Sequence, residues 1–220
     1  MITTDMKREI ISYCNQDIVP DENFNRQTQY HSEWFTQYFS FLSDTSLATN
    51  LGEAFYQARF LYKLMTALTL PKAKSYGIIK FQIIQYASIY EGILDYLLNK
   101  YYKDETEHKY ANIEYSRVSI SASAKITYDG AVVELYKKKI KTKPIKYMRI
   151  QYRLDFAVEK AIISRTLRDR VDALYDTRNN IHILRAIQTQ YKPRVNDSKL
   201  AFELMNDFVN EVKTFCQNTH

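Results

Sequence analysis

Glycine, proline and cysteine are all scarce in this chain of 220 residues, which has four glycines, four prolines and two cysteines. So few turn-forming residues exclude a fold of many short strands and tight turns, and they favour long helices. The two cysteines, Cys14 and Cys216, form no C-x-x-C motif and no Cys/His cluster. A zinc site of the usual kind is therefore not expected, and we predict no metal and no cofactor.

Long apolar runs are also missing. No stretch approaches the length of a transmembrane helix, and the N-terminal "MITTDMKREIISYCNQ" is charged and amphipathic, unlike a signal peptide. The sequence thus predicts a cytoplasmic protein with reduced cysteines and no membrane partner.

Tyrosine and phenylalanine, in contrast, are abundant, with 19 and 11 copies. Most of them fall on apolar helix faces, which predicts core packing, although surface aromatics can also stack on bases. The formal net charge of +6 is compatible with a polyanionic partner but does not require one.

Apolar residues recur at helical spacing along most of the chain, which predicts a mainly all-α fold. Longer helices are expected over residues 4–15, 50–70, 75–102 and 198–217, with further helical segments between 154 and 180. Asn50 and Glu53 resemble a capping box that opens the second helix, and Pro71 ends it. The segment 75–102 is apolar on more than one side, as in a central buried helix.

Two parts of the chain differ in character. Residues 1–70 predict an N-terminal helical extension, whose aromatic stripe from Trp34 to Leu42 indicates core, a dimer seam or a docking surface for a partner. Residues 71–220 predict a second helical domain with an insertion at about 105–150. Within the insertion, residues 115–136 alternate polar and apolar side chains around Asp129-Gly130, which predicts a β-hairpin.

The segment 137–153 is strongly basic and contains no acidic residue. Such a run can follow a phosphate backbone while Tyr147 and Tyr152 stack on bases, or it can be a solvated loop. The predicted RNA-binding residues are Lys137, Lys138, Lys139, Lys141, Lys143, Lys146, Arg149 and Arg153.

A second candidate lies in "LYDTRNNIHIL", where Arg178 and His182 are four residues apart. On a continuous helix this spacing puts both side chains on one face. A phosphate-handling pair is one interpretation. The other is a half-buried histidine that caps helix carbonyls or pairs with Asp176.

This segment resembles the R-N-x-x-H-type motif of the HEPN superfamily, small helical domains of which many are metal-independent endoribonucleases. The similarity spans roughly residues 75–217, from the long helix with "SIYEGILDYLL" to the closing amphipathic helix. It implies a HEPN-like antiparallel helical bundle. It also implies cleavage of single-stranded RNA to 2′,3′-cyclic phosphate ends, in a toxin or an antiviral-defence protein.

The resemblance also implies roles for individual residues. His182 would shuttle protons, Arg178 would brace the phosphate, and Asn179 would hold the histidine tautomer or a phosphate oxygen. Two motifs would meet across a homodimer cleft, and an antitoxin or sensor protein would restrain the activity. Glu91 would orient Arg178, unless it is an ordinary carboxylate on the helix surface.

Two other functions remain open from the sequence. Three residues separate Arg178 from His182, whereas four to six are usual in the family, which favours a module that binds RNA or nucleotides without cutting. The aromatic N-terminal helices would suit a protein that binds a protein partner.

Overall fold

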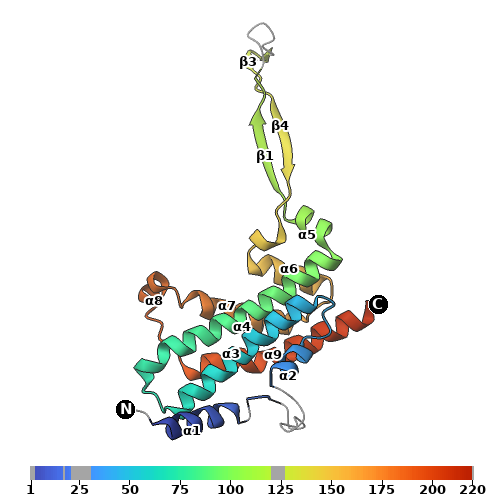
Figure 1. The fold of residues 1–220 in the computed structure, drawn as a ribbon. Helices are drawn as coiled ribbons and strands as arrows, with labels where there is room; N and C mark the ends of the chain where they lie inside the picture. Colours follow the sequence, from blue (N-terminus) through green and yellow to red (C-terminus); the bar gives the residue numbers. More distant parts are fainter. Residues whose placement is uncertain (1–2, 17, 21–30, 120–126, 220) are drawn as a thin grey trace.

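The computed structural model describes residues 3–16, 18–20, 31–119 and 127–219, which form a helical body and one long projecting arm (Figure 1). The fold is mainly helical, as the sequence predicted. The helices of the body are α1 (Thr4–Asn15), α2 (His31–Tyr38), α3 (Thr45–Ala67), α4 (Lys72–Tyr101), α5 (Lys103–Lys109), α6 (Ile150–Glu159), α7 (Arg165–Asn179), α8 (Ile183–Thr189) and α9 (Val195–Asn218).

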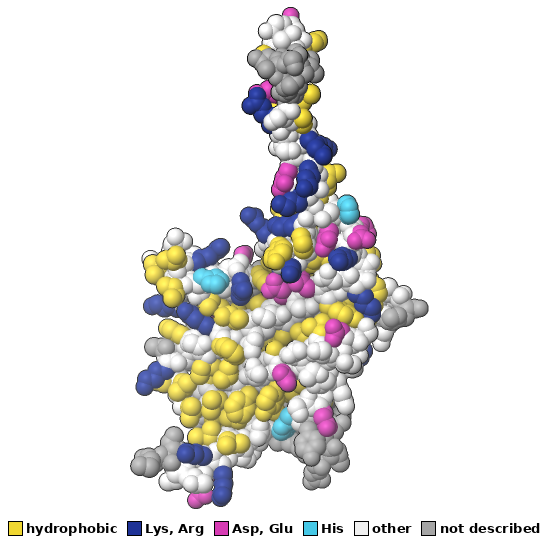
Figure 2. All heavy atoms as spheres, turned by 45° about the horizontal axis from the view of Figure 1, so that its top comes forward, with side chains coloured by type: hydrophobic (Ala, Val, Ile, Leu, Met, Phe, Trp, Pro, Cys, Tyr) yellow, Lys and Arg dark blue, Asp and Glu magenta, His cyan; other side chains and the backbone are white. Residues whose placement is uncertain are grey.

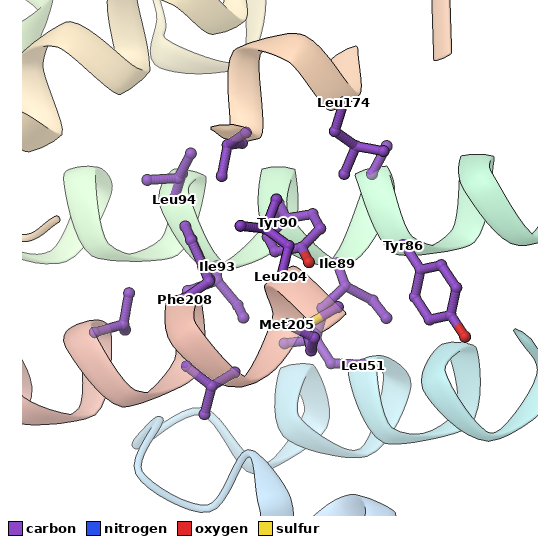
Figure 3. Packing of buried hydrophobic residues seen from close by; sticks show 14 of the residues in the cluster. Leu51, Tyr86, Ile89, Tyr90, Ile93, Leu94, Leu174, Leu204, Met205 and Phe208 are labelled. Carbon is purple, nitrogen blue, oxygen red and sulfur yellow. The ribbon is translucent and has the colours of Figure 1, made fainter. Parts of the chain in front are cut away.

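The long helix α4 is the centre of the body and contacts α3, α6, α7 and α9. Figure 3 shows Tyr90 and Ile93 of α4 packed among side chains of α7 and α9, including Leu174 and Phe208. The Tyr90 hydroxyl donates to the Ala201 carbonyl at 2.7 Å, so this buried polar group is satisfied. The prediction of a central helix that is buried on several sides is confirmed.

Helix α3 runs antiparallel to α4, to which it is joined by residues 68–71 (Figure 1). The predicted cap at Asn50 is wrong: α3 begins at Thr45, and the carboxylate of Asp44 accepts from the Leu47 amide at 2.9 Å. Aspartate is a strong N-cap, and the earlier start extends the buried stripe of the helix by Ala48. Pro71 does not end α3 but precedes the first residue of α4.

The aromatic stripe of the N-terminal third belongs to the same core as α4. Phe35 and Phe39 are fully buried, and Phe35 meets Phe55 of α3 edge-on at 5.0 Å between ring centroids. Helix α2 can come this close because of Gly52: a Cβ there would lie 2.8 Å from the Phe35 carbonyl carbon and oxygen. Of the interpretations that the sequence left open for this stripe, core packing is confirmed for Phe35 and Phe39.

The arm is a two-stranded antiparallel ribbon made of β1 (Asn112–Arg117) and β4 (Tyr136–Lys141), with β2 (Thr127–Tyr128) and β3 (Ala131–Val132) beyond them. Asp129 and Gly130 have φ of 50° and 74°, as a two-residue hairpin turn requires, so the predicted turn is confirmed. The hairpin is longer than the predicted 115–136, because β4 extends into the basic segment. A short 3₁₀ helix, η2 (Ile145–Tyr147), leads from the ribbon to α6.

Candidate functional site

The Arg178–His182 motif lies at the junction of α7 and α8, where the helix ends between the two residues. Asn179 is the last residue of α7, and His182 is the N-cap of α8 with extended backbone angles of −62° and 133°. The two side chains therefore do not share one helix face, and that prediction is wrong. The chain leaves the helix after Asn180, and the Ile181 side chain is buried at the turn.

The two residues have different surroundings. Arg178 is half-buried, and its Nη1 donates to the Asn179 side-chain oxygen at 3.3 Å, so the two residues are already paired in the resting protein. His182 is exposed, and no described residue hydrogen-bonds to its imidazole. The alternative roles of this histidine, capping carbonyls or pairing with Asp176, are thus not seen in the described chain. An exposed imidazole is free to meet a substrate.

Tyr175 lies one turn before Arg178 and carries the motif's helix against α4. Its hydroxyl donates to the Ala87 carbonyl at 2.7 Å. Burial raises the pKa of this phenol well above its usual value, and the nearby Glu91 adds to the effect while Arg153 and Arg178 oppose it. Tyr175 therefore stays neutral and holds the end of α7 in place.

The sequence left two roles open for Glu91, orienting Arg178 or lying on the helix surface as an ordinary carboxylate, and in the structure it pairs with Arg153. The Arg153 Nη2 donates to Glu91 Oε1 at 2.6 Å, and Nη1 donates to the carboxylate of Asp95. The Arg153 side chain is only 4% exposed, so its predicted place in an RNA-binding surface is wrong. The positions of Glu91 and Arg153 have the same physical reason. Glu91 and Asp95 lie one turn apart on α4 and together pair with one buried guanidinium.

Burial raises the pKa of Asp95 above its ordinary value, although the hydrogen bond and charge of Arg153 pull in the opposite direction. Arg153 also brings α6 against α4, since its two partners are both on α4. The cluster is therefore a clamp between α4 and α6, with a buried guanidinium and two partly exposed carboxylates.

The other predicted RNA-binding residues lie along the arm and at its base. Lys137, Lys138, Lys139 and Lys141 are exposed on β4, and Figure 2 shows Lys and Arg side chains along the ribbon. Glu114 of β1 pairs with Lys141 at 3.2 Å. Lys143, Lys146 and Arg149 follow in the connection to α6, where the Lys146 ammonium lies 5.0 Å from the centroid of the Tyr147 ring.

The structure does not bring the motif and the ribbon together. Figure 1 shows α8 at one side of the body and the ribbon projecting from another, with α6 and α7 between them. A ligand that contacts both must therefore be long. A single nucleotide at the motif would not reach the lysines of β4.

Helix α8 was not predicted, and it adds an apolar surface beside the motif. Ile183, Leu184 and Ile187 are 75%, 77% and 69% exposed. Their spacing in "IHILRAI" carries the helical pattern that would have indicated this helix. At the C-terminal end of α8 is a pocket of about 450 Å³, lined by Asn180, Thr189, Gln190, Tyr191, Lys192, Arg194 and Asp197.

Comparison of the chain with protein-family models, with curated proteins and with solved structures found no match. Across the described residues, no helix combines the length and the apolar character needed to cross a membrane. The same residues include no group of three or more His, Cys, Asp or Glu side chains placed to hold a metal ion.

Proposed function

We propose that this protein is a HEPN-type, metal-independent endoribonuclease that cleaves single-stranded RNA, in a toxin or antiviral-defence role. The observation that carries the proposal is the α7–α8 junction, where an exposed imidazole follows a half-buried guanidinium within four residues. The exposed lysines of the ribbon support a polyanionic substrate. The distance between the two regions supports a polymer rather than a nucleotide.

The chemistry follows from the two side chains. An imidazole can take a proton from the 2′-hydroxyl or deliver one to the leaving 5′-oxygen, a step worth about 10²–10⁴ in rate. Arg178 offers a planar fork to the phosphate, and Asn179 already accepts one of its hydrogen bonds. The expected product carries a 2′,3′-cyclic phosphate.

One Arg and one His form a small catalytic set, and a homodimer would double it. The exposed apolar residues of α8 support this part of the proposal, because they lie next to the motif and an exposed apolar patch favours burial in an interface. Packing two α8 helices together would bring two copies of the motif to one cleft. An antitoxin or a sensing partner would then control access to that cleft.

The decisive experiment compares wild type with His182→Ala on end-labelled single-stranded RNA in the presence of EDTA. Cleavage is expected from wild type, with a loss of at least about 10²-fold in the variant. His108→Ala is the matched control, because His108 is also exposed but lies on α5, outside the motif. Equal cleavage by wild type and His182→Ala would reject the assignment.

A second candidate function is RNA binding without cleavage. The break of the helix between Arg178 and His182 favours it, because the two side chains do not project from one face. Intact RNA retained by wild type, and released when Lys137, Lys138 and Lys139 are changed to Gln, would support this function over the nuclease.

A further inference from the structure

The ribbon is exposed on both faces. All residues of β1 and β4 are exposed, and the main contacts of each strand are with the other strand. Isolated two-stranded ribbons are only marginally stable in water, and exposed apolar patches often mark interaction sites. A long ribbon with apolar side chains on its surface is therefore suited to binding a ligand.

The register of the strands divides the ribbon into two unlike faces. Residues that pair across an antiparallel ladder project on the same side. The pairs Asn112–Lys141, Glu114–Lys139 and Ser116–Lys137 make one face polar. The opposite face, called here the tyrosine face, consists of Ile113, Tyr115, Arg117, Tyr136, Lys138 and Ile140.

On the tyrosine face each aromatic ring stands directly opposite a cation. Tyr115 pairs with Lys138, and Tyr136 pairs with Arg117. The two tyrosine side chains are 64% and 53% exposed, so their rings are accessible. None of the six residues is acidic, and the face therefore offers both a flat apolar surface and positive charge to one ligand.

Glu134 lies next to this face and holds two of its residues in the unbound protein. Its carboxylate pairs with Arg117 at 2.6 Å and accepts from the Tyr136 hydroxyl at 2.8 Å. All three side chains are solvent-exposed, and exposed ion pairs of this kind contribute little. A phosphate can therefore replace Glu134 at Arg117 while the Tyr136 ring stays in position.

The spacing of the tyrosines selects the form of the ligand. Tyr115 and Tyr136 are diagonal neighbours across the ladder, which places them about 7–8 Å apart. Stacked bases in a duplex strand are about 3.4 Å apart, so an intact stack does not match the two rings. A single strand whose bases are separated does match them, with one base on each ring.

We propose that the tyrosine face binds single-stranded RNA by stacking successive bases on Tyr115 and Tyr136, with Lys138 and Arg117 on the intervening phosphates. The inference rests on the proposed function, since it takes RNA as the polymer bound. A second copy of the ribbon is a poorer occupant, because packing two such faces together would bring their cations against each other, while Glu134 of each copy is already paired with Arg117.

The test measures binding by full-length protein that carries His182→Ala, so that the probe is not cut. The probe is a fluorescein-labelled oligouridine of about 12 nucleotides, compared with an RNA duplex of equal length. Tyr115→Val/Tyr136→Val keeps residues that favour strands but removes the rings, and it should raise Kd at least about tenfold. Tyr115→Phe/Tyr136→Phe keeps the rings and should bind as the parent does.

A charge-matched pair of variants separates the two faces. Arg117→Gln/Lys138→Gln and Lys137→Gln/Lys139→Gln each remove two positive charges from the ribbon. The first should reduce the slope of log Kd against log salt concentration by about 1.4, since each single-strand phosphate contact contributes about 0.7. The second should change it less.

Equal Kd for the Val and Phe variants, equal affinity for the duplex, or equal loss from both charge variants would overturn the proposal. The outcome that would reject the proposed nuclease activity is distinguishable from these outcomes. A chain that binds through the tyrosine face but never cuts RNA refutes the enzyme alone, and one that cuts RNA with no contribution from Tyr115 and Tyr136 refutes this inference alone.

Discussion

The helical body buries tyrosine and arginine side chains, whereas the ribbon exposes tyrosine and lysine side chains to solvent. Tyr90 in α4 is fully buried and hydrogen-bonded, whereas Tyr115 in β1 is mostly exposed. Arg153 in the body is enclosed by two carboxylates, whereas the lysines of β4 extend into solvent. Residue type alone therefore does not assign a side chain to stability or to binding. The surroundings of the side chain do. Substitutions in the body should therefore lower stability, and substitutions in the ribbon should weaken binding and leave stability almost unchanged.

The largest effect on stability is expected from the body's core. Phe208 of α9 is fully buried and meets Tyr90 edge-on at 4.9 Å between ring centroids. Phe208→Ala leaves a cavity that α4 and α9 cannot fill, and it should lower the free energy of unfolding by about 3–5 kcal/mol. Urea denaturation followed by circular dichroism measures this. A loss below about 1 kcal/mol would mean that the core is not packed as described.

The next largest loss of stability is expected from the clamp that Arg153 makes between α6 and α4. Arg153→Met leaves Glu91 and Asp95 without their cation and should cost about 2–3 kcal/mol, less than a fully buried pair because both carboxylates retain some exposure. The matched change in the ribbon is Lys138→Met, which should leave the midpoint of the urea transition unchanged. Equal effects would remove the distinction between the two regions.

The same clamp gives a pH dependence with a definite sign. The pKa of Asp95 is raised in the folded protein, so the folded state holds this proton more tightly than the unfolded state, and stability falls as pH rises above about 4. Removing Arg153 removes the group that holds this pKa down. The deficit of Arg153→Met should therefore be larger at neutral pH than near pH 4, and Asp95→Asn in the same chain should flatten the difference.

A smaller loss is expected where α2 crosses α3. Gly52→Ala would place a methyl group 2.8 Å from the Phe35 backbone, so the helices must separate, at a cost of about 1–3 kcal/mol. Gly77→Ala is the control, because a Cβ there meets nothing within 4 Å. Thermal unfolding of the two variants should show a lower Tm for the first only.

The smallest effect on stability is expected from the ribbon itself. Replacing residues 112–141 with a short glycine-serine linker should change the unfolding free energy of the body by less than about 1 kcal/mol, because the strands contribute nothing to the described core. RNA binding should be lost in the same protein. Unfolding of the body on this deletion would show that the two regions are not independent.

Local pattern predicted the parts of the fold that local chemistry controls. Apolar residues at helical spacing indicated α4 and α9, and Asp129-Gly130 indicated the hairpin turn, because periodicity and turn conformation depend on neighbours in sequence. The start of α3 was misplaced, since Asn50 and Asp44 are both good caps, and the earlier one adds the buried Ala48 to the helix. Helix α5, with the sequence KDETEHK, has no apolar residue to give a periodic signal, and the pattern of Ile183, Leu184 and Ile187 in α8 was not used.

The candidate site was predicted only in part. Arg178, Asn179 and His182 do lie together in the chain, but the end of α7 between them depends on where Ile181 finds a buried position. The sequence treated 137–153 as one basic segment, and the structure divides it among a strand, a connection and a buried arginine. The different positions of these residues depend on contacts between residues far apart in sequence, such as Arg153 with Glu91 and Asp95.

The mainly helical character, the central apolar helix and the hairpin turn follow from the order of neighbouring residues, so they could be predicted from the sequence. The different positions of Arg153, buried in the body, and Lys138, exposed on the ribbon, depend on how the chain folds in three dimensions. The tertiary structure alone decided that the ribbon has a tyrosine face, since that face exists only when β1 and β4 pair in one register. The physical reason is that burial and cross-strand pairing are properties of residues brought together by folding.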